Sequence, residues 1–133
     1  MATIIDQVKT IVLVMMENRS FDHLLGHLSL DDPSKSINGL KIPLDSYAND
    51  YNGDFYPCFA RDNDQELSFD IPHEWDYVET QLKVTANGKA SMHGFVEAYA
   101  KSIHNTPNLQ CDPMGFFPKQ FVPITEFLAN QLR

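Results

Sequence analysis

Two side chains that can bind a metal ion follow the longest apolar run of the sequence. Residues 11–16, Ile-Val-Leu-Val-Met-Met, are followed directly by Glu17 and Asn18. A carboxylate oxygen and an amide oxygen are hard donors suited to a divalent cation, and the amide NH₂ of Asn18 can alternatively reach a phosphate oxygen. The spacing alone fits a second interpretation equally, in which residues 17–20 are a polar turn that leads into a capped helix.

Histidines are the other candidates for chemistry. His73, in Asp-Ile-Pro-His at residues 70–73, lies near a predicted helix start and is either an anion-binding imidazole or an ordinary capping or surface residue. His23 and His27 share a helix face at i, i+4 spacing. They lack the glutamate of a zinc-protease arrangement, so the sequence does not favour a zinc site there.

The elements that would position these residues alternate between strand and helix. Residues 8–16 are apolar after Thr10, which is typical of an interior parallel strand covered on both faces. Ser20 can cap a helix with apolar residues at helical spacing, namely Phe21, Leu24, Leu25 and Leu28. A strand, a turn and a helix are the opening half of a βαβ unit, whose ligand site forms where the strand ends. Glu17 and Asn18 occupy that position.

A long segment of weak periodicity follows. Residues 29–68 are rich in Asp, Asn, Gly, Pro and Tyr and contain the turn signals Asn38-Gly39 and Asn52-Gly53. We predict an irregular insertion, or a lid over an active site, with one short hairpin.

Three more helices are predicted after this segment. The first is capped by Asp70 and has Pro72 in its first turn, the second covers residues 94–103, and the third follows a Pro-rich bridge at 107–123. Their expected buried faces are Trp75, Val78 and Leu82; Phe95, Ala98, Tyr99 and Ile103; and Ile124, Phe127, Leu128 and Gln131.

Composition indicates a globular chain and excludes some partners. The 133 residues are 43% hydrophobic, enough for one domain with a core, and 18 acidic residues against 10 Lys and Arg give a net charge of −8. Without a basic run, nucleic acid is a disfavoured partner. The longest apolar run is far below the ~20 residues of a spanning helix, so no transmembrane segment or signal peptide is predicted. We therefore expect a cytoplasmic protein, or a secreted or periplasmic one if the chain is a processed fragment.

The cysteines and the strand content leave alternatives open. Cys58 and Cys111 are either one disulfide or two buried thiols, and the absence of an export signal favours thiols. One confident strand cannot form a sheet. The chain is therefore expected to be the front part of a larger α/β domain, or to borrow strands from a partner, for example as a homo-oligomer joined through unpaired strand edges.

Four segments resemble, in order, the motifs of a known family. They are MMENRSFDHLLG at residues 15–26, DIPHEW at 70–75, SMHGFV at 91–96 and MGFFPKQFVPITEFLANQ at 114–131. The first resembles the opening signature of the phosphoesterase family that contains non-specific phospholipases C and acid phosphatases, and the second resembles its Asp-Pro-x-His element. The resemblance covers most of the chain outside residues 29–68.

The resemblance implies an alkaline-phosphatase-like α/β fold and hydrolysis of phosphoric esters by a hydroxyl nucleophile beside a bound metal. By motif, Glu17 is a metal ligand, Asn18 contacts the metal or the substrate phosphate, and His73 holds the phosphate or protonates the leaving oxygen. Oxygen-rich ligation favours calcium, magnesium, manganese or iron over zinc. The substrate is a phospholipid or a small phosphomonoester.

The resemblance also implies an incomplete site. The family's nucleophilic Thr or Ser segment and its Asp-Glu-His-Gly-Gly motif do not occur in these 133 residues. Residues 1–133 are therefore expected to be the N-terminal portion of a phosphoesterase domain, nearly inactive alone. The alternative is a non-catalytic binding or oligomerisation module that uses a helical stripe of Phe95, Tyr99, Phe127 and Leu128.

Overall fold

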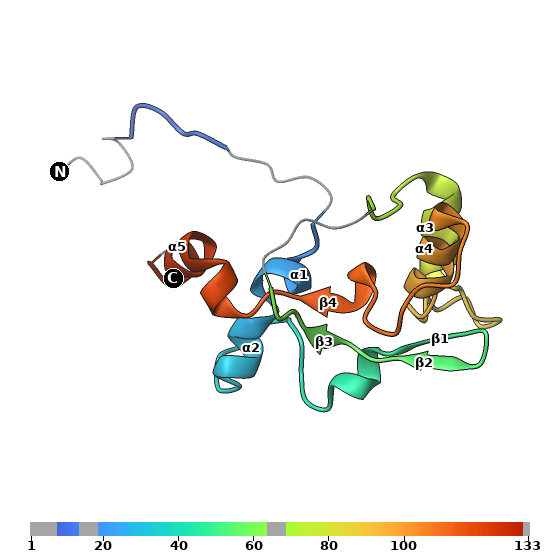
Figure 1. Cartoon of the computed structure of the whole chain (residues 1–133). Coiled ribbons are helices and arrows are strands. Elements are labelled where there is room, and N and C mark those ends of the chain that lie inside the picture. The colour runs from blue at the N-terminus through green and yellow to red at the C-terminus, as the bar shows by residue number, and fades with distance from the viewer. Residues whose placement is uncertain (1–7, 14–18, 64–68, 132–133) are drawn as a thin grey trace.

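The computed structural model describes residues 8–13, 19–63 and 69–131. Its helices are α1 (Phe21–Leu25), α2 (His27–Asp31), α3 (Trp75–Leu82), α4 (Phe95–Ile103) and α5 (Pro123–Gln131). Its strands are β1 (Asn49–Tyr51), β2 (Asp54–Tyr56), β3 (Phe59–Ala60) and β4 (Gly115–Phe116), and short 3₁₀ helices cover residues 44–47, 112–114 and 119–121. Figure 1 shows α3 and α4 side by side at one end of the molecule and α1, α2 and α5 at the other.

The strand predicted over residues 8–16 is wrong for residues 8–13. These residues pair with no strand in the described part of the chain, and Ile11, Val12 and Leu13 are 86%, 79% and 84% exposed. An interior strand needs backbone partners and cover on both faces, and the described residues supply neither. Residues 14–16 lie outside the described residues, as do Glu17 and Asn18.

The helix predicted after Ser20 is confirmed. The Ser20 side-chain oxygen accepts a hydrogen bond from the backbone N–H of His23 at 3.1 Å, which satisfies one free donor of the first turn. The buried face differs from the prediction, because His23, His27 and Leu28 are buried while Phe21 is half exposed. The reason is that β4 packs against this side of α1, and the N–H of Phe117 donates to the carbonyl oxygen of His23 at 2.8 Å.

The predicted hairpin forms at Asn52-Gly53. Strands β1 and β2 pair antiparallel, and the two turn residues have φ values of 53° and 88°, as a tight type I′ turn requires. Strand β3 pairs in parallel with β4, a pairing that was not predicted from the sequence. The described residues 29–63 of the segment expected to be irregular thus carry three short strands, and its role as a lid stays a prediction.

Helix α4 forms as predicted and supplies the centre of the core, but Phe95 and Ile103, expected on its buried face, are only half-buried. Val96 and Tyr99 pack with Tyr56, Cys111 and Met114 in one buried cluster. Cys58 and Cys111 are free thiols as the sequence favoured, although Cys111 is buried and Cys58 is only half-buried. Helices with small parallel and antiparallel sheets are consistent with an α/β fold.

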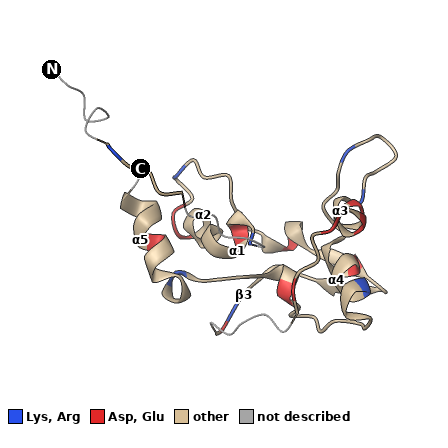
Figure 2. Ribbon diagram, turned by 90° about the horizontal axis from the view of Figure 1, so that it is seen from above, with Lys and Arg blue, Asp and Glu red and all other residues tan. Residues whose placement is uncertain are grey.

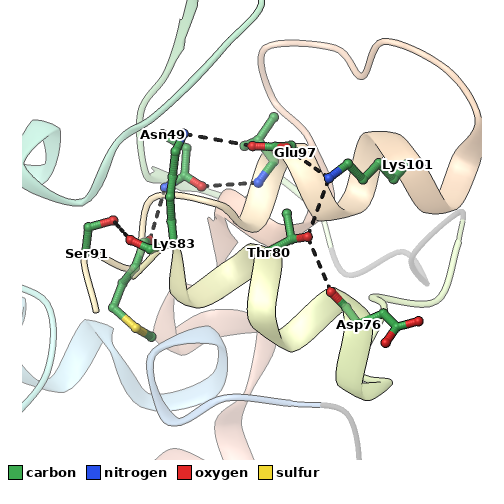
Figure 3. A network of polar contacts seen from close by, with 9 residues as sticks. Asn49, Asp76, Thr80, Lys83, Ser91, Glu97 and Lys101 are labelled. Atoms are coloured by element: carbon green, nitrogen blue, oxygen red, sulfur yellow. Dashed lines mark hydrogen bonds and ion pairs between the residues drawn. The ribbon is translucent and has the colours of Figure 1, made fainter. Parts of the chain in front are cut away.

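Helix α3 starts later than predicted. Its cap is Glu74 rather than Asp70, so Pro72 and His73 precede the helix. Trp75, expected in the core, is 72% exposed, and the buried residue of α3 is instead Gln81. The polar contacts in Figure 3 show how α3 and α4 are joined: Lys101 lies 2.9 Å from a carboxylate oxygen of Glu97 and 3.5 Å from the hydroxyl of Thr80.

Helix α5 forms as predicted but contributes no buried residue. Ile124, Phe127 and Leu128, expected to be buried, are 75%, 59% and 49% exposed.

Among the described helices none is long and apolar enough to cross a membrane. In Figure 2 the described Lys and Arg residues lie in separate segments on several elements rather than in one patch.

Candidate functional site

His73 and Ser20, far apart in the sequence, line the same cavity. The cavity has a volume of about 300 Å³. Its wall is formed by the start of α1, by the segment before α3 and by residues around β4, with Ser20, Asp22, His23, Leu40, Cys58, Ile71, Pro72, His73, Gln81, Phe95, Pro113, Gly115 and Phe116 as lining residues. The structure therefore brings the predicted phosphate-contacting histidine to the N-terminus of the first helix.

The His73 ring is oriented by its own segment. Its Nδ1 lies 3.2 Å from the carbonyl oxygen of Ile71, and its backbone N–H donates to the Glu74 carboxylate at 3.2 Å. Because a carbonyl oxygen only accepts, this contact favours the tautomer that carries its proton on Nδ1. The Nε2 atom is then the one left to exchange a proton with a ligand.

Asp22 and Cys58 add a carboxylate and a thiol to the cavity wall. The Oδ1 atom of Asp22 is buried and has no hydrogen-bond partner among the described residues, and burial raises the pKa of this carboxyl. Burial, followed by the nearby charge of Asp22, raises the pKa of Cys58 to about 11. The thiol is therefore protonated at neutral pH and is a poor nucleophile.

His23, which lines the cavity, and His27 are both buried. The His23 ring contacts the Phe117 ring at a centroid distance of 4.9 Å. The Nε2 of His23 and both ring nitrogens of His27 have no hydrogen-bond partner within the described ranges. In the same ranges no group of three His, Cys, Asp or Glu side chains can hold a metal ion.

Acid is expected to destabilise the chain through His23. Burial, followed by the charges of Arg19 and Arg61, lowers the pKa of His23 from 6.5 to about 4, while Asp112 acts in the opposite direction. As the pH falls below 6.5 the unfolded chain binds a proton that the folded chain does not, so stability present above pH 6.5 is lost towards pH 4. We expect a loss of roughly 2 kcal/mol from this group.

Urea unfolding at pH 7 and at pH 4.5 measures this loss. The variant His23→Phe, which keeps a ring against Phe117 and removes the titrating group, should lose less stability over the same range. His93→Ala, at an exposed position, is the control and should follow the wild type. If His23→Phe and the wild type lose the same stability between pH 7 and pH 4.5, the loss does not come from His23.

A second cavity adjoins the first and was not predicted. It has a volume of about 390 Å³ and shares Ser20, Asp22, Leu40, Cys58, Phe95 and Pro113 with the first cavity. Its other lining residues include Tyr47, Asn49 and His93. His93 lies in the SMHGFV segment but was not singled out from the sequence, and the signal available there was the histidine beside Gly94.

The predicted metal ligands Glu17 and Asn18 lie outside the described residues. Ser20, which follows Asn18 by two positions, is on the cavity wall. Of the predicted site residues, the structure therefore places His73, and it adds Asp22 and Gln81 to its surroundings.

The chain belongs to the phosphoesterase family, whose profile matches residues 8–132. Over 126 residues it is 30% identical to the non-specific phospholipase C1 of Arabidopsis thaliana, and over 131 residues it is 33% identical to the non-specific phospholipase C6 of the same plant. Each match covers 93% of this chain and 23% of the relative, so the chain spans about a quarter of the length of these curated relatives. No solved structure matches it significantly. The family resemblance of the sequence motifs is confirmed.

Proposed function

We propose that this chain forms part of the active site of a metal-dependent phosphoric ester hydrolase of the phospholipase C type. Membership of the phosphoesterase family and the two phospholipase C relatives support the class of reaction. The observation that carries the proposal is the shared cavity of His73 and Ser20. The cavity is lined by His73, from the DIPHEW motif, and by Ser20, the cap of α1, which lies two residues after Asn18.

In this proposal Glu17 and Asn18 supply oxygen donors to the cation, and His73 acts on the phosphate. Carboxylate and amide oxygens fit calcium, magnesium, manganese or iron. The Oδ1 of Asp22, which has no hydrogen-bond partner among the residues that the structure describes, is a further hard donor on the cavity wall. When bound, the cation neutralises charge on the phosphoryl oxygens and lowers the pKa of the attacking hydroxyl. In its imidazolium form, in which Nε2 also carries a proton, His73 would donate a hydrogen bond to a phosphate oxygen or transfer that proton to the leaving oxygen.

Ser20 is assigned a structural role in this proposal. Its side-chain oxygen accepts the N–H of His23 and so serves as the cap of α1. The attacking hydroxyl and the remaining ligands would come from the part of a phosphoesterase domain that this chain does not match. The substrate is a phospholipid, in keeping with the names of the relatives, or a small phosphomonoester.

Divalent-cation binding tests the proposed ligands. Calorimetric titration of the 133-residue chain with Ca²⁺, Mg²⁺ or Mn²⁺ should show a single site that Glu17→Gln weakens at least about tenfold, because even outer-shell substitutions cost roughly 10–100-fold. Glu126→Gln, which removes the same charge from α5, is the matched control and should bind like the wild type. Equal binding by Glu17→Gln and wild type would remove Glu17 from the site.

An activity assay tests the assignment of Ser20. The chain is expected to hydrolyse a chromogenic phosphomonoester very little, with or without added cations. Turnover that Ser20→Ala abolishes would make this serine the nucleophile and overturn its assignment as a cap only.

The second candidate function is a non-catalytic interaction module. The observation that favours it is α5, whose apolar residues Ile124, Phe127 and Leu128 are exposed. Of the helical stripe expected for such a module, Phe127 and Leu128 are exposed, whereas Tyr99 is in the core and Phe95 is partly buried. A folded chain that binds none of the three cations in the titration above would favour the module over the hydrolase.

A further inference from the structure

The segment that carries His73 is fixed by a side chain from α3. The Nε2 of Gln81 donates to the carbonyl oxygen of Pro72 at 2.6 Å, in a buried contact. The Pro72 carbonyl belongs to the peptide bond that leads into His73, whose N–H donates to Glu74. Because a peptide unit is planar, holding its oxygen and its N–H together fixes the backbone at His73. The Pro72 ring itself is buried.

Gln81 is in turn held by contacts that lead to buried residues of the core. Its backbone carbonyl accepts the N–H of Gly94 at 3.2 Å, at the start of α4. That helix start is held by Asn49, whose Oδ1 accepts the N–H of Val96 at 3.1 Å. Asn49 and Val96 are 1% and 0% exposed. A polar chain of contacts therefore runs from the core through Gln81 to the His73 backbone.

Burial of Gln81 needs an explanation, because it is the one fully buried residue of α3, whose apolar residues Val78 and Leu82 are only half-buried. An apolar residue of similar length would fill the same space at lower cost. What an apolar residue cannot do is donate to the Pro72 carbonyl, and Gln81 also lines the cavity that His73 shares with Ser20. We infer that Gln81 is a positioning residue, which holds His73 at the cavity through the Pro72 carbonyl.

The catalytic meaning of this inference rests on the proposed function, but the positioning is measurable without activity. Imidazole NMR spectra of the 133-residue chain report on its histidines, and His73→Ala assigns the signal of interest. In Gln81→Met the His73 signal should lose its wild-type position, while those of His93 and His104 stay. Thr80→Val is the matched control, since it removes the α3 bonds of Thr80 with Asp76 and Lys101 and leaves Pro72 untouched.

The variant Gln81→Glu gives a test in which pH switches the hydrogen bond to Pro72 on and off. When the introduced carboxyl group is protonated it can donate to the Pro72 carbonyl, whereas the ionised carboxylate cannot. The His73 signal should therefore differ from wild type at pH 7.5 and return to the wild-type position when both proteins are compared at an acid pH of about 5. A His73 signal that is unchanged in folded Gln81→Met, that moves equally in Thr80→Val, or that is not restored by acid in Gln81→Glu overturns the inference.

A titration with inorganic phosphate separates this inference from the proposed function. In the wild type with Mg²⁺ present, phosphate should shift the His73 signal. Failure of that shift counts against the phosphate role of His73, whereas the comparison of Gln81→Met with wild type still decides the positioning role.

Discussion

Gly94→Ala is expected to destabilise the chain by at least about 3 kcal/mol. A Cβ at Gly94 would overlap the carbonyl oxygen of Thr80 and lie 2.7 Å from its carbonyl carbon. These are backbone atoms of α3, so no side-chain rotation relieves the overlap and the two helices must move apart. Thermal unfolding should show a melting temperature lower by at least about 10 °C.

The control for this prediction is another glycine. Gly88 has a φ of 78° and nothing within 4 Å of an added Cβ, so Gly88→Ala tests backbone strain without a clash. We expect a cost of roughly 1 kcal/mol there. If Gly94→Ala costs no more than Gly88→Ala, the close contact of α3 with α4 is not as described.

Asn49→Ala is expected to cost about 2–4 kcal/mol. The substitution removes the acceptor for the buried N–H of Val96 and the donor to the Met92 carbonyl, at 3.1 and 3.5 Å. Gly94, at the cap position of α4, has no side chain to replace that acceptor. A buried donor without a partner and a small cavity both destabilise.

Urea unfolding monitored by circular dichroism measures this cost. The matched control is Asn87→Ala, which removes hydrogen bonds with Thr85 and Lys89 in an exposed turn. That variant should lose less than about 1 kcal/mol. Equal losses in the two variants would contradict the role of Asn49 as the cap of α4 supplied from β1.

Local chemistry made part of the fold predictable. The Ser20 cap and the Asn52-Gly53 turn act within a few residues, and both form where the sequence placed them. The apolar periodicity of α4 identified two of its four buried residues, Ala98 and Tyr99, and missed the other two, Val96 and Ala100. These features depend on neighbours in sequence, which a single sequence contains.

Features that depend on distant partners were predicted less well. The pairing of β3 with β4 involves two residues from each strand, too few to give a periodic pattern. The apolar residues of 8–13 and of α5 were expected in a core, but burial requires covering elements that the described residues do not provide. Likewise the buried side chain of Gln81 donates to the Pro72 carbonyl, a contact that the helical periodicity of the sequence does not indicate.

The candidate site likewise has a part that the sequence motifs predicted and a part that depends on tertiary packing. His73 was identified by its motif and is placed at the cavity, whereas Glu17 and Asn18 remain predictions outside the described residues. Asp22 was not singled out from the sequence, and its buried Oδ1, without a hydrogen-bond partner in the described part of the chain, became evident only from the packing around α1.

The cavity of His73 has walls from separate stretches of the chain, including Ser20, Cys58, Pro72 and Gly115. Unfolding separates these stretches, so a small molecule that occupies the cavity binds the native state alone. By mass action it then shifts the folding equilibrium, by about 2.7 kcal/mol when its free concentration is about 100 times its Kd. Thermal-shift screening of the intact chain can thus rank candidate phosphoesters by affinity, without any requirement for turnover.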